Sequence, residues 1–175
     1  VNGLSKRIGS FRIEDMSFKL PEGYIMGLIG TNGAGKTTLI HLLLDLYHPD
    51  NVEVLVDGMS YKDNEKLIKD IIGTVLLDET FFPSFTLRQN GDYFGKYYSQ
   101  YDVNVLENYI NRFGLDINDE YKHLSKGQKL KFEFAFALAH APKLLILDEP
   151  TANFDPEFRK EFFKVIAEFI EDGTR

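Results

Sequence analysis

The stretch Gly30-Thr31-Asn32-Gly33-Ala34-Gly35-Lys36-Thr37-Thr38 sets the expected fold of this 175-residue chain. It matches the pattern G-x-x-x-x-G-K-S/T, a loop whose glycines let the backbone curl until several N–H groups point at one anion. The helix that follows such a loop aims its positive N-terminal end at the same point. There Lys36 reaches the β- and γ-phosphates of a nucleotide, and the Thr37 hydroxyl is a ligand for Mg²⁺. All nine residues are predicted to bind nucleotide, with Lys36 also acting in catalysis and Thr37 in metal binding.

The segments on either side of the loop occur in the order that phosphate binding needs. Residues 24–30 (YIMGLIG) read as a strand that is apolar on both faces, which indicates a sheet covered on both sides. Residues 37–47 continue as a helix with a repeating apolar face. That face consists of Leu39, Leu42, Leu43 and Leu46. This strand–loop–helix order favours a phosphate-binding loop over a flexible glycine turn.

The rest of the chain alternates strands with helices. Strands are expected over residues 1–20, 52–58, 71–77 and 143–148, with a turn at 21–23. Helices are expected over 125–139 and 155–170, and a helical insertion of two helices over 86–113, broken near 99–102. The pattern predicts an α/β fold with a P-loop NTPase-type core and a mostly parallel sheet. An N-terminal antiparallel strand region and a small helical subdomain complete it.

A second motif, Leu144-Leu145-Ile146-Leu147-Asp148-Glu149, places two carboxylates directly after a buried strand. In open α/β sheets, ligands bind at the carboxyl ends of the strands. Asp148 is therefore predicted to hold Mg²⁺, and Glu149 to face the γ-phosphate and polarise the attacking water. Alone, the motif would also suit two solvated acids at the end of a strand. The phosphate loop in the same chain favours the catalytic interpretation.

A third motif, Leu124-Ser125-Lys126-Gly127-Gln128, opens a helix with Ser125 as its expected N-cap. The Ser125 hydroxyl, the Gly127 backbone and the helix dipole together make a second anion site. Ser125, Gly127 and Gln128 are thus candidates to bind an anion. In isolation the motif would read as an ordinary capped helix.

Composition and charge narrow the classes of function. The chain has 27 acidic against 20 basic residues and a net charge of −7, whereas a protein that holds a nucleic-acid backbone needs a basic surface. No nucleic-acid partner is expected. There is no Cys, and none of the His residues has the spacing of a zinc site. Neither a signal peptide nor an apolar run of roughly 18 to 20 residues is present. We therefore expect a cytoplasmic location, with membrane association only through a partner.

Four segments together resemble the nucleotide-binding domain of the ABC ATPases. They are residues 30–38, LSKGQ at 124–128, LLILDEPT at 144–151 and TANFD at 151–155. They occur in the order and at about the spacing of the family, and they cover nearly the whole chain. The resemblance implies ATP and Mg²⁺ as cofactors and Glu149 as the catalytic carboxylate. It also implies a head-to-tail homodimer or heterodimer with a second ABC ATPase domain. ATP would lie between the phosphate loop of one domain and residues 125–128 of the other, with Asp155 at the same interface.

The resemblance further implies a domain layout and a membrane partner. Residues 1–175 would form a single ABC nucleotide-binding domain, with a core lobe at about 1–80 and 140–175 and a helical lobe at about 85–140. An integral-membrane permease would dock between the lobes, around residues 76–88, and hold the chain on the inner face of the cell membrane. Three aromatic residues there are either apolar anchors for that contact or interior residues. They are Phe81, Phe82 and Phe85.

Two positions depart mildly from the family pattern. The family usually stacks an aromatic residue on adenine, and Ile8 or Phe11 must serve here. Lys126 stands where the signature segment usually has Gly, which we interpret as a variant form.

Two departures are larger. The family usually places a Gln near Leu77, where it contacts Mg²⁺ or the attacking water, and we hypothesise that Asp78 or Glu79 substitutes for it. The family also carries a His beyond the final helix that contacts the γ-phosphate. No His follows His140, so the sequence is expected to be C-terminally incomplete.

The function predicted from these features is an ATP-hydrolysing subunit that powers a membrane ABC transporter through ATP-driven dimer closure. Export is favoured by the LSKG form and the irregular segment near Leu77. One alternative is a soluble ABC ATPase of the translation-factor or DNA-repair type. Another is a regulatory module that binds ATP without turnover, against which the intact Glu149 argues.

Overall fold

The computed structural model describes residues 1–31, 33–76, 80–151 and 154–171 of the chain. The chain divides into two compact units. The first comprises Val1–Lys69 and the described residues after Glu168, and the second comprises Asp70–Glu168.

The first unit begins with an antiparallel hairpin of β1 (Leu4–Ile8) and β2 (Phe11–Met16), which confirms the expected N-terminal strands. A later segment fixes this hairpin by side-chain hydrogen bonds. The Ser5 N–H donates to Asn51 Oδ1 at 2.8 Å, and the Arg7 N–H donates to Asp50 Oδ2 at 2.9 Å. Leu4 is fully buried, so the hairpin also contributes to the core of its unit.

Helix α1 (Lys36–Leu43) follows the phosphate loop as expected but ends before the predicted Tyr47. Leu39 and Leu42 are buried. Asp45 has φ 57, in the left-handed region where few side chains are found, so the helix cannot continue. Leu46 consequently lies outside the helix and is 56% exposed, although the sequence pattern places it on the apolar face.

The strand predicted over residues 24–30 is absent from the structure. The segment is irregular, and Ile25 and Ile29 are exposed. A strand exists through its hydrogen-bonded ladder, and among the described residues no strand pairs with this segment. The apolar pattern identified a segment able to form a buried strand, but pattern alone does not supply the neighbouring strand. The expected turn at 21–23 is present, with Gly23 at φ 76.

The predicted strand over 52–58 is reduced to β3 (Leu55–Val56), which pairs antiparallel with β4 (Met59–Ser60). Asp57 and Gly58 connect them with φ 51 and 74. Positive φ at both central residues is the requirement of the tightest hairpin turns, and Asp-Gly is a preferred sequence there. Helix α2 (Tyr61–Asp70) follows and was not predicted. It is joined to α1 by the Tyr61 hydroxyl, which donates to the Leu43 carbonyl at 2.8 Å.

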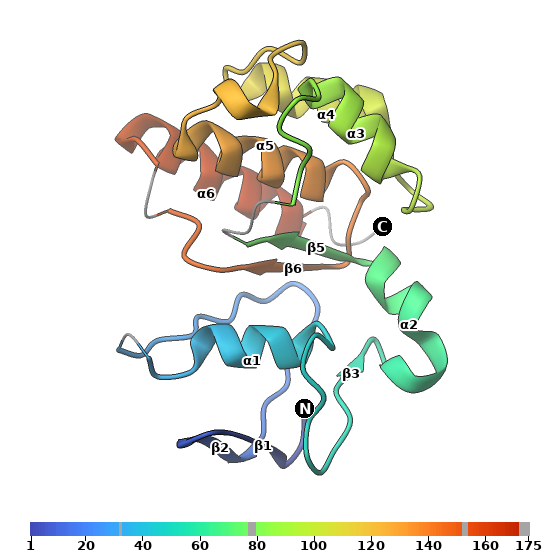
Figure 1. Ribbon diagram of the computed structural model, residues 1–175, viewed down its shortest axis with the longest axis vertical. Coiled ribbons are helices and arrows are strands. Elements are labelled where there is room, and N and C mark those ends of the chain that lie inside the picture. The colour runs from blue at the N-terminus through green and yellow to red at the C-terminus, as the bar shows by residue number, and fades with distance from the viewer. Residues whose placement is uncertain (32, 77–79, 152–153, 172–175) are drawn as a thin grey trace. The chain divides into compact units, whose positions relative to one another are not determined.

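The second unit contains the parallel strands β5 (Ile72–Val75) and β6 (Leu144–Leu147), as expected from their apolar runs. Helix α5 (Lys126–Leu138) packs against this pair (Figure 1). Gly73 makes the close approach possible, because a Cβ atom there would lie 2.7 Å from Leu145 Cδ2 and 3.1 Å from the Ala137 carbonyl oxygen.

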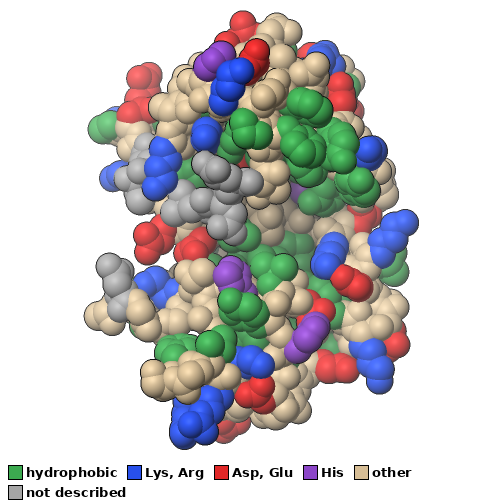
Figure 2. Space-filling view, in the orientation of Figure 1, with side chains coloured by type: hydrophobic (Ala, Val, Ile, Leu, Met, Phe, Trp, Pro, Cys, Tyr) green, Lys and Arg blue, Asp and Glu red, His purple; other side chains and the backbone are tan. Residues whose placement is uncertain are grey.

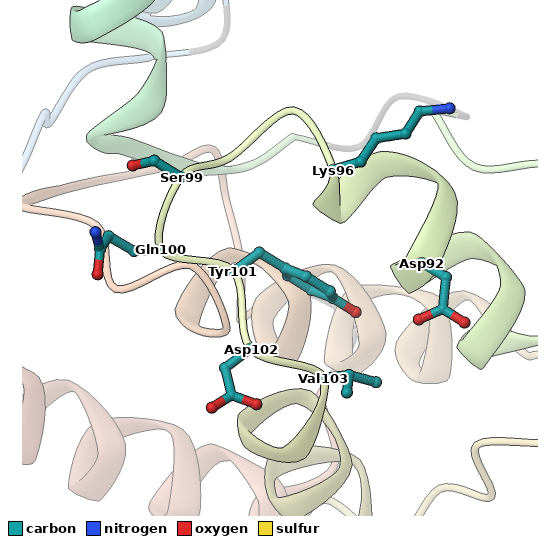
Figure 3. A pocket seen from close by; sticks show the side chains of 7 residues that line it. All are labelled: Asp92, Lys96, Ser99, Gln100, Tyr101, Asp102 and Val103. Atoms are coloured by element: carbon teal, nitrogen blue, oxygen red, sulfur yellow. The ribbon is translucent and has the colours of Figure 1, made fainter.

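The predicted helical insertion consists of two helices, α3 (Leu87–Gly95) and α4 (Val103–Arg112), with a break between them. Thr86 and Gln89 form a capping box at the start of α3. Tyr101, in the break, directs its ring toward α3 (Figure 3). Gly91 and Gly95 admit this side chain, since a Cβ atom at Gly95 would lie 2.3 Å from the Tyr101 ring and one at Gly91 would lie 2.6 Å from its hydroxyl oxygen.

The remaining elements are a short 3-10 turn, η1 (Tyr121–His123), and the final helix α6 (Pro156–Glu171), which belongs to the second unit up to Glu168. Two groups of aromatic rings, all buried except the half-buried Phe94, form the core of the second unit. Phe81 is surrounded by Phe94, Tyr121, Phe132 and Phe136. Phe134 and its neighbours join α4, α5 and α6, through Phe113, Phe154, Phe158 and Phe162. In the part of the chain that the structure describes, no helix has the length and apolarity needed to cross a membrane.

His140 joins the end of α5 to β5 and should make stability depend on pH. Its Nδ1 lies 3.3 Å from the Phe136 carbonyl oxygen, its Nε2 lies 3.2 Å from that of Ile72, and its ring stacks on Tyr98. Burial lowers the pKa of His140 below 6.5. Below pH 6.5 the unfolded chain therefore takes up this proton more readily than the folded chain. The free energy of unfolding should fall by up to about 1.4 kcal/mol per pH unit toward acid.

This dependence is checked by denaturant unfolding between about pH 5 and 6.5, above the range in which carboxylates ordinarily titrate. His140→Gln keeps an N–H donor and does not titrate, so it should flatten the slope in that window. His123→Gln, at an exposed histidine of η1, is the matched control and should retain the slope. An unchanged slope in His140→Gln would refute the assignment.

Candidate nucleotide-binding site

The phosphate loop is closed on itself by its own lysine. Lys36 Nζ donates to the carbonyl oxygens of Gly30 at 2.9 Å and Thr31 at 3.2 Å. The Ala34 N–H donates to the Thr31 carbonyl at 3.1 Å, which forms a turn within the loop. Gly33 and Gly35 have φ 80 and 91, a conformation open to glycine and costly for other residues. The loop residues thus have the curled backbone that the motif predicts; Asn32 lies outside the described residues.

The loop leads directly into the first turn of α1. Gly35 is its N-cap residue and Lys36 its first residue, and the N-cap position itself, being glycine, makes no side-chain hydrogen bond. Thr37 is exposed and Thr38 is half-buried. A helix N-terminus beside a curled loop is an arrangement that favours a bound anion.

Phe11 covers one side of this helix start. A Cβ atom at Gly35 would lie 2.0 Å from Phe11 Cζ, so any residue other than glycine would displace the ring. Ile8, its cross-strand partner, is 41% exposed. Of the two candidates for the adenine contact, Phe11 therefore packs on the loop itself and Ile8 presents a free apolar surface.

The two carboxylates of the second motif lie at the carboxyl end of the parallel strands. The Asp148 N–H donates to the Val75 carbonyl at 3.0 Å, one step beyond the last paired residues of β5 and β6. Glu149 is exposed and has φ 45. A left-handed conformation is strained for glutamate and tends to persist at functional sites. The sequence contained no signal for this strain.

The third motif forms the expected helix cap. The Gln128 N–H donates to Ser125 Oγ at 3.3 Å, and the Ser125 N–H donates to Gln128 Oε1 at 2.9 Å. This reciprocal pair confirms Ser125 as the N-cap of α5. Lys126 and Gly127 occupy the first two helical positions.

The predicted site residues are divided between the two units. The phosphate loop with Thr37 and Thr38 belongs to the first unit, whereas Asp148, Glu149 and residues 125–128 belong to the second. Each part has the local geometry described above. Asp78 and Glu79, the hypothesised substitutes for the usual Gln, lie outside the described residues, as does Leu77.

The donor set suits Mg²⁺ by its chemistry. Mg²⁺ takes oxygen ligands and is commonly held by one or two protein groups together with substrate phosphates. Thr37 offers a hydroxyl at a helix start, and Asp148 offers a carboxylate at a strand end. These two groups are of the kind that Mg²⁺ with ATP requires.

The aromatic residues of the expected permease contact separate into two kinds. Phe81 is buried, whereas Phe82 and Phe85 are 40% and 36% exposed. The exposed pair contacts Tyr93 of α3, and Figure 2 shows hydrophobic side chains gathered over this helix. The buried side chain of Asn90 fixes the backbone at Phe82. It accepts a hydrogen bond from the Phe82 N–H at 2.9 Å and donates one to the Phe82 carbonyl at 3.1 Å.

A shallow surface hollow of about 580 Å³ lies beside α3, elsewhere in the second unit (Figure 3). Asp92, Lys96 and Tyr101 line it with neighbouring loop residues, and none of the predicted nucleotide-binding residues does. The hollow is therefore unrelated to the predicted site.

Comparison with known proteins identifies the family. The model of the ABC transporter family matches residues 13–152. The uncharacterized ABC transporter ATP-binding protein YdbJ of Bacillus subtilis (strain 168) is 35% identical, over 99% of this chain and 58% of that protein. The Nod factor export ATP-binding protein I of Burkholderia lata is 32% identical, over 97% of this chain and 58% of that protein.

A solved structure of an ATP-binding subunit of an ABC transporter matches with a TM-score of 0.90. It is 24% identical and covers 97% of this chain and 73% of its own, so this likeness concerns the fold. The chain spans somewhat more than half the length of the two curated relatives, 58% in each case. Because the family model matches most of its length, the chain belongs to the ABC transporter family and contains a nucleotide-binding domain of the ABC ATPase type.

Proposed function

We propose that this chain binds and hydrolyses ATP and so powers an ABC transporter, in the direction of export. The observation that carries the proposal is the curled loop closed by Lys36 at the N-terminal start of α1. The name of the relative from Burkholderia lata states export for that protein. The Lys126 form of the signature segment favours the same direction here.

In this function the phosphate loop and the α1 N-terminus hold the triphosphate by backbone N–H groups. The Lys36 ammonium exchanges the Gly30 and Thr31 carbonyl oxygens for phosphate oxygens, a charge-assisted contact that is stronger than the one it replaces. Thr37 and Asp148 would hold Mg²⁺, which neutralises charge on the phosphates when bound. Glu149 orients the attacking water and accepts its proton.

Ser125, Gly127 and Gln128 act on the ATP held by a second ABC ATPase domain. The Ser125 hydroxyl and the first N–H groups of α5 would face the γ-phosphate of the partner domain's nucleotide. Two bound ATP molecules close the dimer, and hydrolysis reopens it. In this arrangement Asp155 lies at the interface between the domains, and residues 1–175 act as one nucleotide-binding domain with a core and a helical lobe.

The exposed pair Phe82 and Phe85, with Tyr93, offers an apolar surface for an integral-membrane permease. Aromatic side chains are enriched at the centres of interfaces. The Asn90 hydrogen bonds hold this surface in a fixed shape, so docking costs little ordering. Through this contact the domain would be held at the cytoplasmic face of the membrane.

Replacing Lys36 by Ala should weaken Mg·ATP binding by about 10- to 100-fold, because a charged hydrogen-bond donor to phosphate is lost. Equilibrium titration of the full-length protein with a fluorescent ATP analogue measures the change. Lys66→Ala, at an exposed lysine of α2, is the matched control and should bind as the unmodified protein does. Unchanged affinity in Lys36→Ala would remove the basis of the proposal.

Co-purification separates transport from a soluble ABC ATPase. Affinity purification of the full-length protein from detergent-solubilised membranes should recover a polytopic membrane protein in stoichiometric amount. A protein that hydrolyses ATP at an undiminished rate yet purifies alone would instead be a soluble ABC ATPase.

A further inference from the structure

Lys131 of α5 is more constrained than the other lysines of that helix. Its Nζ lies 3.5 Å from Asp155 Oδ2, and its side chain is only 17% exposed. The same ammonium group lies 4.3 Å from the centre of the Phe158 ring. A lysine covered to this extent is ordinarily paired, and here the carboxylate and the ring face together hold the charge.

Both groups that contact Lys131 are themselves fixed. Asp155 Oδ1 accepts from the Phe158 N–H at 2.7 Å and so caps α6, which leaves Oδ2 for Lys131. That backbone hydrogen bond and the nearby Lys131 charge lower the pKa of Asp155, so the carboxylate is ionised. The Phe158 ring is buried and packs edge-on against Phe113 at 5.0 Å. Lys131 therefore connects α5 to the start of α6.

This connection joins two parts of the proposed site within one unit. Ser125 opens α5 six residues before Lys131, and Asp155 follows Glu149 by six residues along the chain. We propose that Lys131 is a positioning residue of the ATPase reaction. It holds Asp155 in a fixed position relative to α5, the helix that begins at Ser125. The inference rests on the proposed function. Because Lys131 contacts Asp155 and Phe158 rather than the phosphate loop, it should act on turnover and not on ATP affinity.

The test is a double-mutant cycle on steady ATP hydrolysis by the full-length protein. Lys131→Gln should lower kcat about threefold to fivefold, the upper part of the range for a partly exposed ion pair, with KM for ATP unchanged. Lys131→Arg retains the charge and should restore most of the rate. Asp155→Asn removes the charge but keeps a good N-cap, so Lys131→Gln should have no further effect in that background.

Lys129 provides the control, since its ammonium also lies over a ring of the second unit, that of Tyr121 at 4.9 Å. Lys129→Gln should leave kcat unchanged. An unaffected kcat in Lys131→Gln overturns the inference, and so do effects of Lys131→Gln and Asp155→Asn that multiply. Failure of the proposed function is a different result: the unmodified protein would not hydrolyse ATP at all, or Lys36→Ala would not weaken binding.

Discussion

Glu149→Gln should lower steady ATP turnover by about 10²- to 10⁴-fold, the range associated with a positioned general base. The amide keeps the size and hydrogen-bonding reach of the side chain but cannot accept the proton of the attacking water. Asp148 stays in place through its backbone bond to Val75, so the Mg·ATP affinity should change by less than about threefold. Phosphate release measured at saturating ATP, beside equilibrium binding, gives both quantities for the full-length protein.

Glu157→Gln is the matched control for this substitution. Glu157 is exposed in the first turn of α6, and its replacement should leave turnover within about twofold of the unmodified protein. Undiminished turnover in Glu149→Gln would assign the base to another residue. Binding without any turnover in the unmodified protein would favour the regulatory alternative over an ATPase.

The sequence predicted best those elements whose signals are local. The N-cap Ser125, the apolar run of β6 and the glycines of the phosphate loop each encode their own conformation within a few residues. Each is present in the structure at its expected place. The two helices of the insertion were predicted from a helical pattern broken near residues 99–102. The structure adds the caps that start them, a capping box for α3 and the N-cap Asp102 for α4.

Elements that depend on distant partners were predicted less well. Residues 24–30 have the pattern of a buried strand, yet strand formation needs a neighbour that pattern cannot supply. Helix α2 was missed because its polar sequence, YKDNEKLIKD, buries only Tyr61 and Ile68. Such a helix is stabilised by contacts such as the Tyr61–Leu43 hydrogen bond, which are invisible in the sequence.

The candidate site shows the same difference between local signals, which the sequence contains, and contacts between distant residues, which it does not. Its residue types were found from motifs, but two features of their arrangement were not. The left-handed backbone of Glu149 results from the end of a strand meeting a turn. The Lys131–Asp155 contact joins residues that lie 24 positions apart in the sequence and that meet because α5 packs against α6. Neither leaves a periodic or compositional signal.

Phe134→Ala should lower the free energy of unfolding by about 3 to 5 kcal/mol, the usual cost of removing a buried aromatic ring. Its side chain is fully buried on α5. The ring stacks on Phe113 after α4 at 5.7 Å and lies 4.8 Å from the Phe162 ring of α6. Since a domain has about 5 to 15 kcal/mol of stability in all, this substitution removes a large share of it.

Two further variants test whether the loss of stability comes from the missing buried ring or would follow from any substitution of a phenylalanine in these helices. Phe163→Ala, at a 57% exposed neighbour of Phe162 on α6, should cost less than about 1 kcal/mol, as surface positions usually do. Phe134→Leu fills part of the space and should fall between the two. Urea unfolding of the full-length protein measures all three. A cost below about 1 kcal/mol for Phe134→Ala would mean that the rings between α4, α5 and α6 do not form a tightly packed core. In that case α5 could not hold Ser125 and Lys131 rigidly enough for either to act on ATP turnover.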